Sequence, residues 1–134
     1  LTNQKFTRSN EYASYIVDAV TNNNESIVYG NVINNGLIDN LPNNSCVEVP
    51  CEVNSNGFYA KKIGKLPEHL AALMRTNINV QLLTAEAAIT KKKEHIYHAA
   101  MLDPLTSSNL SIDEIYKMTD EMLDAHKEFL PEYN

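Results

Sequence analysis

Hydrophobic positions follow two different spacings along the chain, and the change from one to the other marks the predicted elements. Residues spaced as on one face of a helix predict an amphipathic helix at about 9–22. Alternating positions then predict strands at about 26–33, 46–53 and 58–63. The alternation is strictest in the second strand, at Val47, Val49, Cys51 and Val53. The first half of the chain therefore predicts one helix followed by a small, mostly antiparallel sheet.

After the third strand the hydrophobic spacing is helical to the end of the chain. A long helix is predicted from Pro67 to about Ile89, and its wide apolar face predicts burial on two sides. A shorter helix is expected at about 92–102, and a last one begins at the capping box formed by Ser111 and Glu114. The order of helix, three strands and three helices predicts an α+β fold, in which helices cover the small sheet.

Two features of the second strand constrain its place in the sheet. Pro50 has no backbone N–H, so the strand is expected at a sheet edge or with a bulge at this residue. Cys46 and Cys51 are five positions apart, which places them on opposite faces and prevents them from pairing with each other. Both are expected to be free thiols in a reducing compartment, and we therefore expect a cytoplasmic protein.

Composition and charge narrow the class of protein. The 134 residues suit a single domain, 1–134, and 43% hydrophobic and 21% charged residues are typical of a globular protein. A net charge of −6, with no basic stripe beyond Lys91-Lys92-Lys93, argues against nucleic acid as a partner. No apolar run approaches the roughly 20 residues of a membrane-spanning helix, so a membrane is not an expected partner either.

Two polar segments are the candidate sites. The loop at 34–44 carries many amides and one carboxylate between two buried strands, a composition suited to hydrogen bonding a sugar. Its candidate residues are Asn34, Asn35, Asp39 and Asn40. The alternative is that these residues shape turns by bonding their own backbone. On the long helix, Arg75 and Asn77 belong to a polar stretch of poor helix propensity, which is typical of a site or of a buried amide network.

The remaining chemistry-bearing residues favour structural roles. His95 and His98 lie three positions apart on a predicted helix and could face one metal ion, but the sequence places no third ligand beside them. Packing or surface histidines are therefore the favoured interpretation. The two cysteines lack a basic neighbour or a helix N-terminus that would activate a thiol. Because no phosphate-binding glycine turn and no hydrolase motif is present, the chain by itself predicts no catalytic, cofactor or metal site.

A series of short motifs follows in fixed order along nearly the whole chain. They are RSNEY at 8–12, GNV at 30–32, NNGLIDNLP at 34–42, CVEVPC at 46–51, IGKLPEHLAALMRTNINVQ at 63–81, EAA at 86–88 and YHAAMLDPLTSS at 97–108. The series resembles the carboxyl-terminal part of glycoside hydrolase family 4. The residues of the motifs CVEVPC and RTNINVQ favour the α-galactosidase (melibiase) branch, and the phospho-glycosidase and galacturonidase branches are the alternatives.

This resemblance implies a fold and a chemistry that extend over a longer chain. Family members look like lactate and malate dehydrogenases, with an amino-terminal dinucleotide-binding domain and a carboxyl-terminal α+β domain that closes over the substrate. The resemblance implies that NAD⁺ oxidises the sugar, that manganese stabilises the enolate and that a tyrosine removes a proton before the aglycone is eliminated. This mechanism sets the family apart from two-carboxylate glycosidases. The family's dinucleotide loop, metal ligands and base tyrosine lie upstream of the matching part, so none of these roles is carried over to a residue of this chain.

Two functions are therefore the leading hypotheses. In the first, the chain is the substrate-side and subunit-contacting domain of a longer NAD- and manganese-dependent α-galactosidase, whose dinucleotide-binding domain lies upstream. We expect that parent to act on a glycoside and to form homo-oligomers, and we expect the isolated fragment to be inactive and to bind neither cofactor. In the second, it is a free-standing, non-catalytic module for small-ligand binding or assembly. A weaker third is a small metalloenzyme built on His95, His98 and a carboxylate.

Overall fold

The structure, a computed structural model, describes residues 11–134 and has five helices and three strands in that range. In chain order they are α1 (Ala13–Asn22), β1 (Ser26–Ile33), β2 (Cys46–Asn54), β3 (Gly57–Ala60), α2 (Glu68–Thr90), α3 (Lys93–Leu102), α4 (Pro104–Asn109) and α5 (Ile112–Ala125). The strands form one antiparallel sheet in the order β1-β2-β3. The predicted α+β class with a small antiparallel sheet is confirmed. The start predicted for the first helix, at about residue 9, lies outside the described residues.

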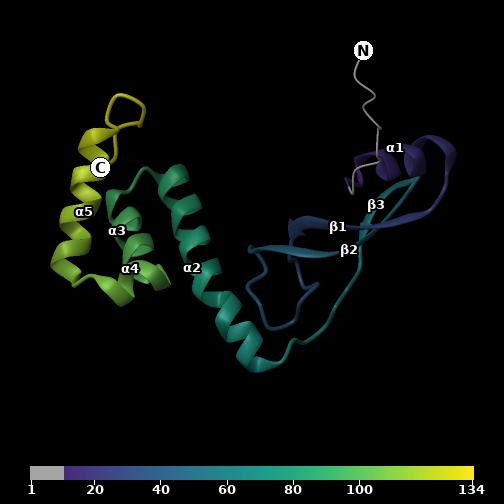
Figure 1. The fold of residues 1–134 in the computed structure, drawn as a ribbon, viewed down its shortest axis with the longest axis horizontal. Coiled ribbons are helices and arrows are strands. Elements are labelled where there is room, and N and C mark those ends of the chain that lie inside the picture. Colours follow the sequence, from purple (N-terminus) through teal and green to yellow (C-terminus); the bar gives the residue numbers. More distant parts are fainter. Residues whose placement is uncertain (1–10) are drawn as a thin grey trace, which may run out of the picture.

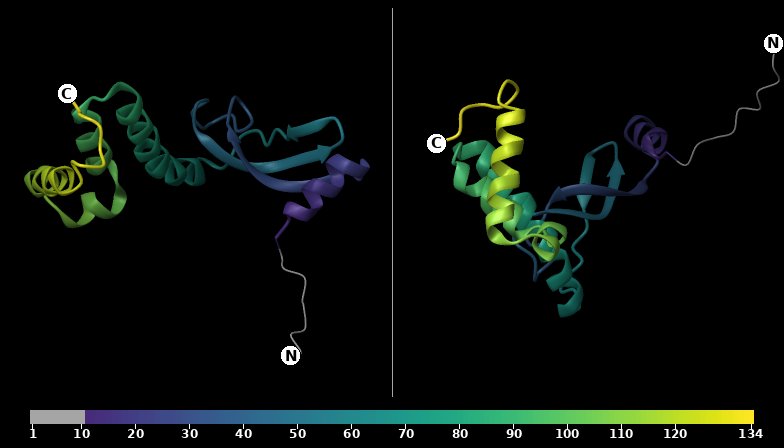
Figure 2. Two further views of the ribbon diagram at one scale, coloured as in Figure 1. Left: turned by 90° about the horizontal axis from the view of Figure 1, so that it is seen from above. Right: turned by 60° about the vertical axis from the view of Figure 1, so that its left-hand side comes forward.

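The elements are spread along an elongated molecule (Figure 1). The sheet and α1 lie at one end, α3, α4 and α5 lie at the other, and α2 runs between the two ends (Figure 1, and Figure 2, left). Helix α1 packs on β1 and β2, α3 packs on α2, and α4 and α5 pack on α3. None of the helices among residues 11–134 is both long and apolar enough to cross a membrane.

The main core lies at the sheet end of the molecule. The predicted alternation of β2 is confirmed, because it buries Val47, Val49, Cys51 and Val53. These side chains pack with Ala19 of α1, Ile38 and Leu41 of the β1–β2 loop, and Ala71 and Ile78 of α2. The first half of α2 is thus part of the sheet's core. The other end has separate buried residues, among them Ala99 and Ile115.

The prediction drawn from Pro50 is wrong, because β2 is the central strand and pairs with β1 without a bulge. The reason is that β3 ends at Ala60, opposite Cys51, so that Pro50 lies just beyond the last β3 pair. The Pro50 carbonyl still accepts a hydrogen bond from the Lys61 N–H at 2.8 Å. Since the N–H and C=O of one strand residue point to the same side, the N–H that proline lacks would also have faced β3. Pro50 therefore costs no bond to β1.

The helical part differs from the prediction in two respects. First, α4 was not predicted: Pro104 ends the preceding helix but also begins a new one, behind Asp103, whose carboxylate accepts a hydrogen bond from the Thr106 N–H at 2.8 Å. Second, α2 is buried on two sides only in part and in different stretches: Ala71 and Ile78 join the sheet's core, while Ala87 is buried about half a turn away around the helix. Its only buried residues are Ala71, Ile78 and Ala87, and its large exposed side chains are Leu70, Leu73, Met74 and Ile89.

Candidate functional site

Asn34 builds the loop between β1 and β2 and does not face solvent. Its side chain is fully buried, and its amide nitrogen donates to the carbonyl oxygens of Ile38, Leu41 and Pro42 at 3.0, 3.0 and 3.1 Å. Its amide oxygen accepts a hydrogen bond from the Ile38 N–H at 2.7 Å. Both polar atoms of the side chain are used within the loop. For Asn34 the structure supports the turn-forming alternative and corrects the expectation of a sugar contact.

Asn40 joins the loop to the segment that leads into α2. Its amide nitrogen donates to the Leu66 carbonyl oxygen at 2.9 Å, and its amide oxygen accepts from the Leu66 N–H at 3.0 Å. The side chain is half-buried. This two-way pair fixes the start of α2 against the loop, so Asn40 also has a structural role.

Arg75 brings the two predicted polar segments together. Its guanidinium reaches from α2 to the loop and donates to the Asn40 carbonyl oxygen at 2.8 Å. The loop and α2 are therefore connected twice, through the Asn40–Leu66 pair and through Arg75. Asn77 is placed differently. It is exposed and lines a hollow of about 200 Å³ between α2 and the start of β2, together with Met74 and Gln81.

Asn35 and Asp39 are the loop candidates that remain exposed. Asn35 has a left-handed backbone with φ 38°, and its N–H donates to the Asn43 carbonyl oxygen at 2.9 Å. The Asp39 carboxylate forms an ion pair with Lys62 at 2.9 Å. Exposed pairs of this kind contribute at most about 1 kcal/mol. Asp39 can therefore exchange Lys62 for another hydrogen-bond donor, such as a hydroxyl group.

The histidines of α3 do not form a metal site with their neighbours. The ring centroids of His95 and His98 are 6.5 Å apart in an edge contact, and the buried Nδ1 of His95 has no hydrogen-bond partner. Within residues 11–134, no three His, Cys, Asp or Glu side chains gather in a way that could hold a metal ion. The chain's four glycines form no GxGxxG turn. These residues fit neither manganese nor a dinucleotide.

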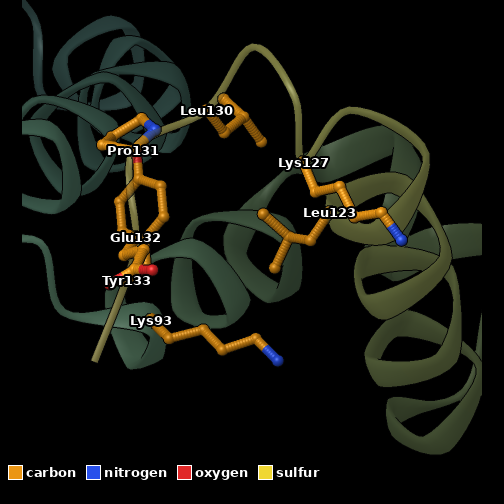
Figure 3. A pocket seen from close by; sticks show the side chains of 7 residues that line it. All are labelled: Lys93, Leu123, Lys127, Leu130, Pro131, Glu132 and Tyr133. Atoms are coloured by element: carbon orange, nitrogen blue, oxygen red, sulfur yellow. The ribbon is translucent and has the colours of Figure 1, made fainter.

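Sequence reasoning missed a hollow of about 250 Å³ at the other end of the molecule, between α3, α5 and the C-terminal segment (Figure 3). The sequence contains no sign of this hollow because most of the residues that line it come after α5 in the chain, where the hydrophobic positions have no regular spacing. Its two lysines are already paired with carboxylates of α5, Lys93 with Asp120 at 2.8 Å and Lys127 with Asp124 at 3.0 Å. The hydrogen bond to Asp120 raises the pKa of Lys93. We therefore do not assign this hollow to the candidate site.

Comparison with known proteins places the chain in a family. Residues 2–106 match the Family 4 glycosyl hydrolase C-terminal domain. The alpha-galactosidase of Bacillus subtilis (strain 168) is 52% identical over 94% of this chain, which corresponds to 29% of that protein. The alpha-galactosidase of Rhizobium meliloti (strain 1021) is 36% identical, again over 94% of this chain and over 26% of that protein.

A solved structure agrees with the sequence relatives. The crystal structure of a 6-phospho-alpha-glucosidase from gut microorganisms, in complex with NAD and glucose-6-phosphate, has a TM-score of 0.78 and 27% identity. The similarity covers 90% of this chain and 26% of that one, so the chain spans less than a third of each protein to which it is similar. The shared part includes the loop, the sheet and α2, since the family match ends at residue 106. The chain belongs to the C-terminal domain family of the family 4 glycosyl hydrolases.

Proposed function

We propose that this chain is the C-terminal domain of a longer glycoside hydrolase, an α-galactosidase that uses NAD and manganese. The single observation that carries the proposal is the 52% identity to the Bacillus subtilis alpha-galactosidase, of which the chain matches 29%. NAD is supported by the ligands of the 6-phospho-alpha-glucosidase structure, which is 27% identical. Manganese follows from the family resemblance. The parent's substrate would be a glycoside with a terminal α-galactosyl group.

The role proposed for the domain itself is to present a fixed polar surface toward the substrate side. Its support is the connection of the loop to α2 through Asn40 and Arg75, together with the burial of Asn34 inside the loop. A loop held in this way presents Asn35 and Asp39 in a defined geometry. Preorganised polar groups lose less conformational entropy when a ligand binds. The domain would therefore supply position and hydrogen bonds, while the reacting groups come from elsewhere in the parent.

An assay of the parent polypeptide tests the activity. With an aryl α-galactoside we expect turnover that requires both NAD⁺ and Mn²⁺ and stops when a chelator is added. An aryl 6-phospho-α-glucoside is the competing substrate, and turnover of that compound alone would move the protein to the phospho-glycosidase branch. The 134-residue chain should give no turnover and no calorimetric signal with NAD⁺. Turnover by this chain alone would contradict the domain assignment.

A second candidate function is a free-standing, non-catalytic module. One observation favours it: the sheet, α1 and the first half of α2 enclose a core of their own. A folded 134-residue chain that binds galactose in calorimetry, while the parent shows no NAD-dependent turnover, would support this alternative.

We also propose a cytoplasmic location for the parent, supported by its thiols. Both cysteines are free, and Cys46 is exposed. Unpaired, exposed thiols are typical of reducing compartments. Cell fractionation with an antibody against the domain would test the location. Recovery in a secreted or periplasmic fraction would contradict it.

A further inference from the structure

The loop between β1 and β2 carries a single charge, and the segment that follows β3 supplies its partner. Asp39 is the only charged residue of the loop at 34–44. Its carboxylate pairs with the Lys62 ammonium group at 2.9 Å, and the two side chains are 47% and 65% exposed. An exposed ion pair of this kind contributes little to stability. Stability therefore does not explain why the loop's one charge has a partner here.

Backbone hydrogen bonds hold both members of the pair in place. The Asp39 N–H donates to the Gly64 carbonyl oxygen at 3.0 Å. In return, the Leu37 carbonyl oxygen accepts from the N–H groups of Ile63 and Gly64 at 2.8 and 3.0 Å. Gly64 has φ 84°, a left-handed backbone that glycine adopts readily. Lys62 directly precedes these residues, so the pair sets the charge of a surface whose backbone is already fixed.

The other cations of the same stretch also have partners. Residues 61–75 contain three lysines and one arginine. Besides Lys62 they are Lys61, paired with Glu52 at 3.2 Å, Lys65, paired with Glu68 at 2.7 Å, and Arg75, bonded to the Asn40 carbonyl oxygen at 2.8 Å. This described stretch therefore offers a negatively charged ligand no lysine or arginine that is without a partner.

Such a surface favours a neutral sugar over a phosphorylated one. A sugar hydroxyl group can donate a hydrogen bond to the Asp39 carboxylate. A phosphate group carries about one and a half to two negative charges at neutral pH and presents acceptor oxygens. It is repelled by the carboxylate of Asp39, and the ammonium group of Lys62 is already paired. Asp39 thus attracts one class of sugar and repels the other.

We propose that the Asp39–Lys62 pair is a specificity determinant of the parent enzyme, which favours neutral α-galactosides over their 6-phosphorylated forms. Asp39 accepts a hydrogen bond from the sugar, and it also neutralises the lysine that would otherwise attract a phosphate group. This role rests on the proposed function, because it requires the loop to face the substrate. It adds to that function the two residues of this chain that discriminate against a charged substrate.

Kinetics of the parent enzyme with a matched pair of substrates test this role. The pair is an aryl α-galactoside and the same compound phosphorylated at its 6-hydroxyl group. The wild type should have the higher kcat/KM with the neutral compound. Asp39→Asn should raise kcat/KM for the phosphorylated compound by about tenfold or more, because Lys62 is then free to bind the phosphate group. Added salt should reduce this gain, since exposed charges are screened.

Two further variants separate the pair from a general change of charge. Asp39→Asn combined with Lys62→Gln should lose the gain, because no freed lysine remains. Glu52→Gln is the matched control: it frees Lys61, the neighbouring lysine, whose partner lies on β2, and should leave the preference unchanged. Circular dichroism establishes that every variant is folded.

The contrary outcomes distinguish this role from the proposed function. An unchanged kcat/KM of Asp39→Asn for the phosphorylated compound would overturn the role of the pair, as would a double variant that keeps the gain. A wild type that uses both compounds equally well would overturn the role of the pair alone. A wild type that is inactive on the neutral compound would overturn the proposed function as well.

Discussion

A single buried amide determines the conformation of the loop between β1 and β2. Asn34 binds one N–H and three carbonyl groups of residues that come four to eight positions later. Buried backbone groups require partners, and the loop's own backbone supplies only some of them. Backbone N–H groups also reach the carbonyls of Ile38 and Pro42, at 3.3 and 3.1 Å, whereas the Leu41 carbonyl relies on Asn34. The side chain of one residue thus completes the hydrogen bonding that the loop's backbone leaves open.

Replacing this residue should therefore destabilise the fold. Asn34→Ala leaves the Leu41 carbonyl and the Ile38 N–H without their partner, and it removes one of several hydrogen bonds from two further carbonyls. We therefore expect a loss of about 2–3 kcal/mol in the free energy of unfolding. Urea titration followed by circular dichroism measures it. Asn44→Ala, at an exposed amide of the same loop, should change this free energy by less than about 0.5 kcal/mol. Similar losses in both variants would contradict the role assigned to Asn34.

Replacing Asp39, in contrast to Asn34, should change activity and not stability. In the parent enzyme, Asp39→Asn is expected to raise KM or lower kcat by about tenfold, which corresponds to the loss of one hydrogen bond to a charged group. Its stability should stay close to that of the wild type, because the Lys62 pair is exposed. Steady-state kinetics and a urea titration together separate the two effects. Unchanged kinetics in a stable variant would leave Asp39 only its turn-forming role.

At the scale of single residues, the sequence shows that the loop is unusually polar, but it does not show which of the loop's residues are structural and which are free to meet a ligand. Asn34 and Asn35 are adjacent and have identical side chains, yet one is fully buried and the other is exposed. The difference arises because the carbonyls of Leu41 and Pro42 come close to Asn34 only in the folded loop. That contact cannot be predicted from the spacing of residues along the chain.

At the scale of elements, the ends of helices were more predictable than the surfaces they bury. The capping box of α5 is confirmed, since Ser111 accepts from the Glu114 N–H and the Glu114 carboxylate accepts from the Ser111 N–H. Hydrogen bonds from Ser111 lower the pKa of Glu114. Caps depend on residues three positions apart, which a sequence shows directly. What covers α2 depends on distant parts of the molecule, so the sequence indicated two buried sides but not that each side is buried along only part of the helix.

The contact between α3 and α5 should depend on pH through Asp120. Hydrogen bonds from Lys93 and Tyr97, at 2.8 and 2.5 Å, lower the pKa of Asp120. A carboxyl group with a lowered pKa in the folded state contributes its full stability above the ordinary aspartate pKa and loses it as the pH falls through the lowered value. The wild-type contact should therefore weaken only in acid, below the ordinary range of aspartate.

Asp120→Asn tests this dependence. The variant should melt at a lower temperature at neutral pH and should lose less on acidification than the wild type, because its side chain does not titrate. Thermal melts followed by circular dichroism at neutral and acidic pH measure both effects. Glu121→Gln removes the same charge from the next residue of α5, whose contact with Lys117 at 3.9 Å is long and exposed, and it serves as the control. An equal response of both variants would contradict a specific role for Asp120.

At the scale of the molecule, two packed ends share one helix. The sheet end holds the main core, and the helical end has fewer buried residues, which lie outside that core. The order of elements could be predicted from periodicity, but this elongated arrangement could not. The sequence shows that Leu70, Leu73 and Met74 are apolar, but it does not show whether the same chain covers them.

Unequal cores should produce unequal stability at the two ends. In hydrogen exchange followed by mass spectrometry, we expect peptides from α3, α4 and α5 to exchange before those from β1 and β2 in the 134-residue chain. The reason is that local opening costs least where few apolar contacts are buried. As the urea concentration is raised, the helical end should lose its protection from exchange before the sheet does. Simultaneous exchange of all these peptides would indicate one cooperative unit.

The length of α2 has a further consequence for how this domain can vary. Its 23 residues span about 35 Å, and each added residue would turn everything beyond it by about 100° around the helix axis. A single insertion would therefore rotate α3, α4 and α5 relative to the sheet, whereas seven inserted residues would restore their direction to within about 20°. Helix α2 therefore sets both the distance and the rotation of the helical end relative to the sheet. Length differences among members of this family should thus collect at residues 61–67 and around 91–92, where an extra residue need not turn either end.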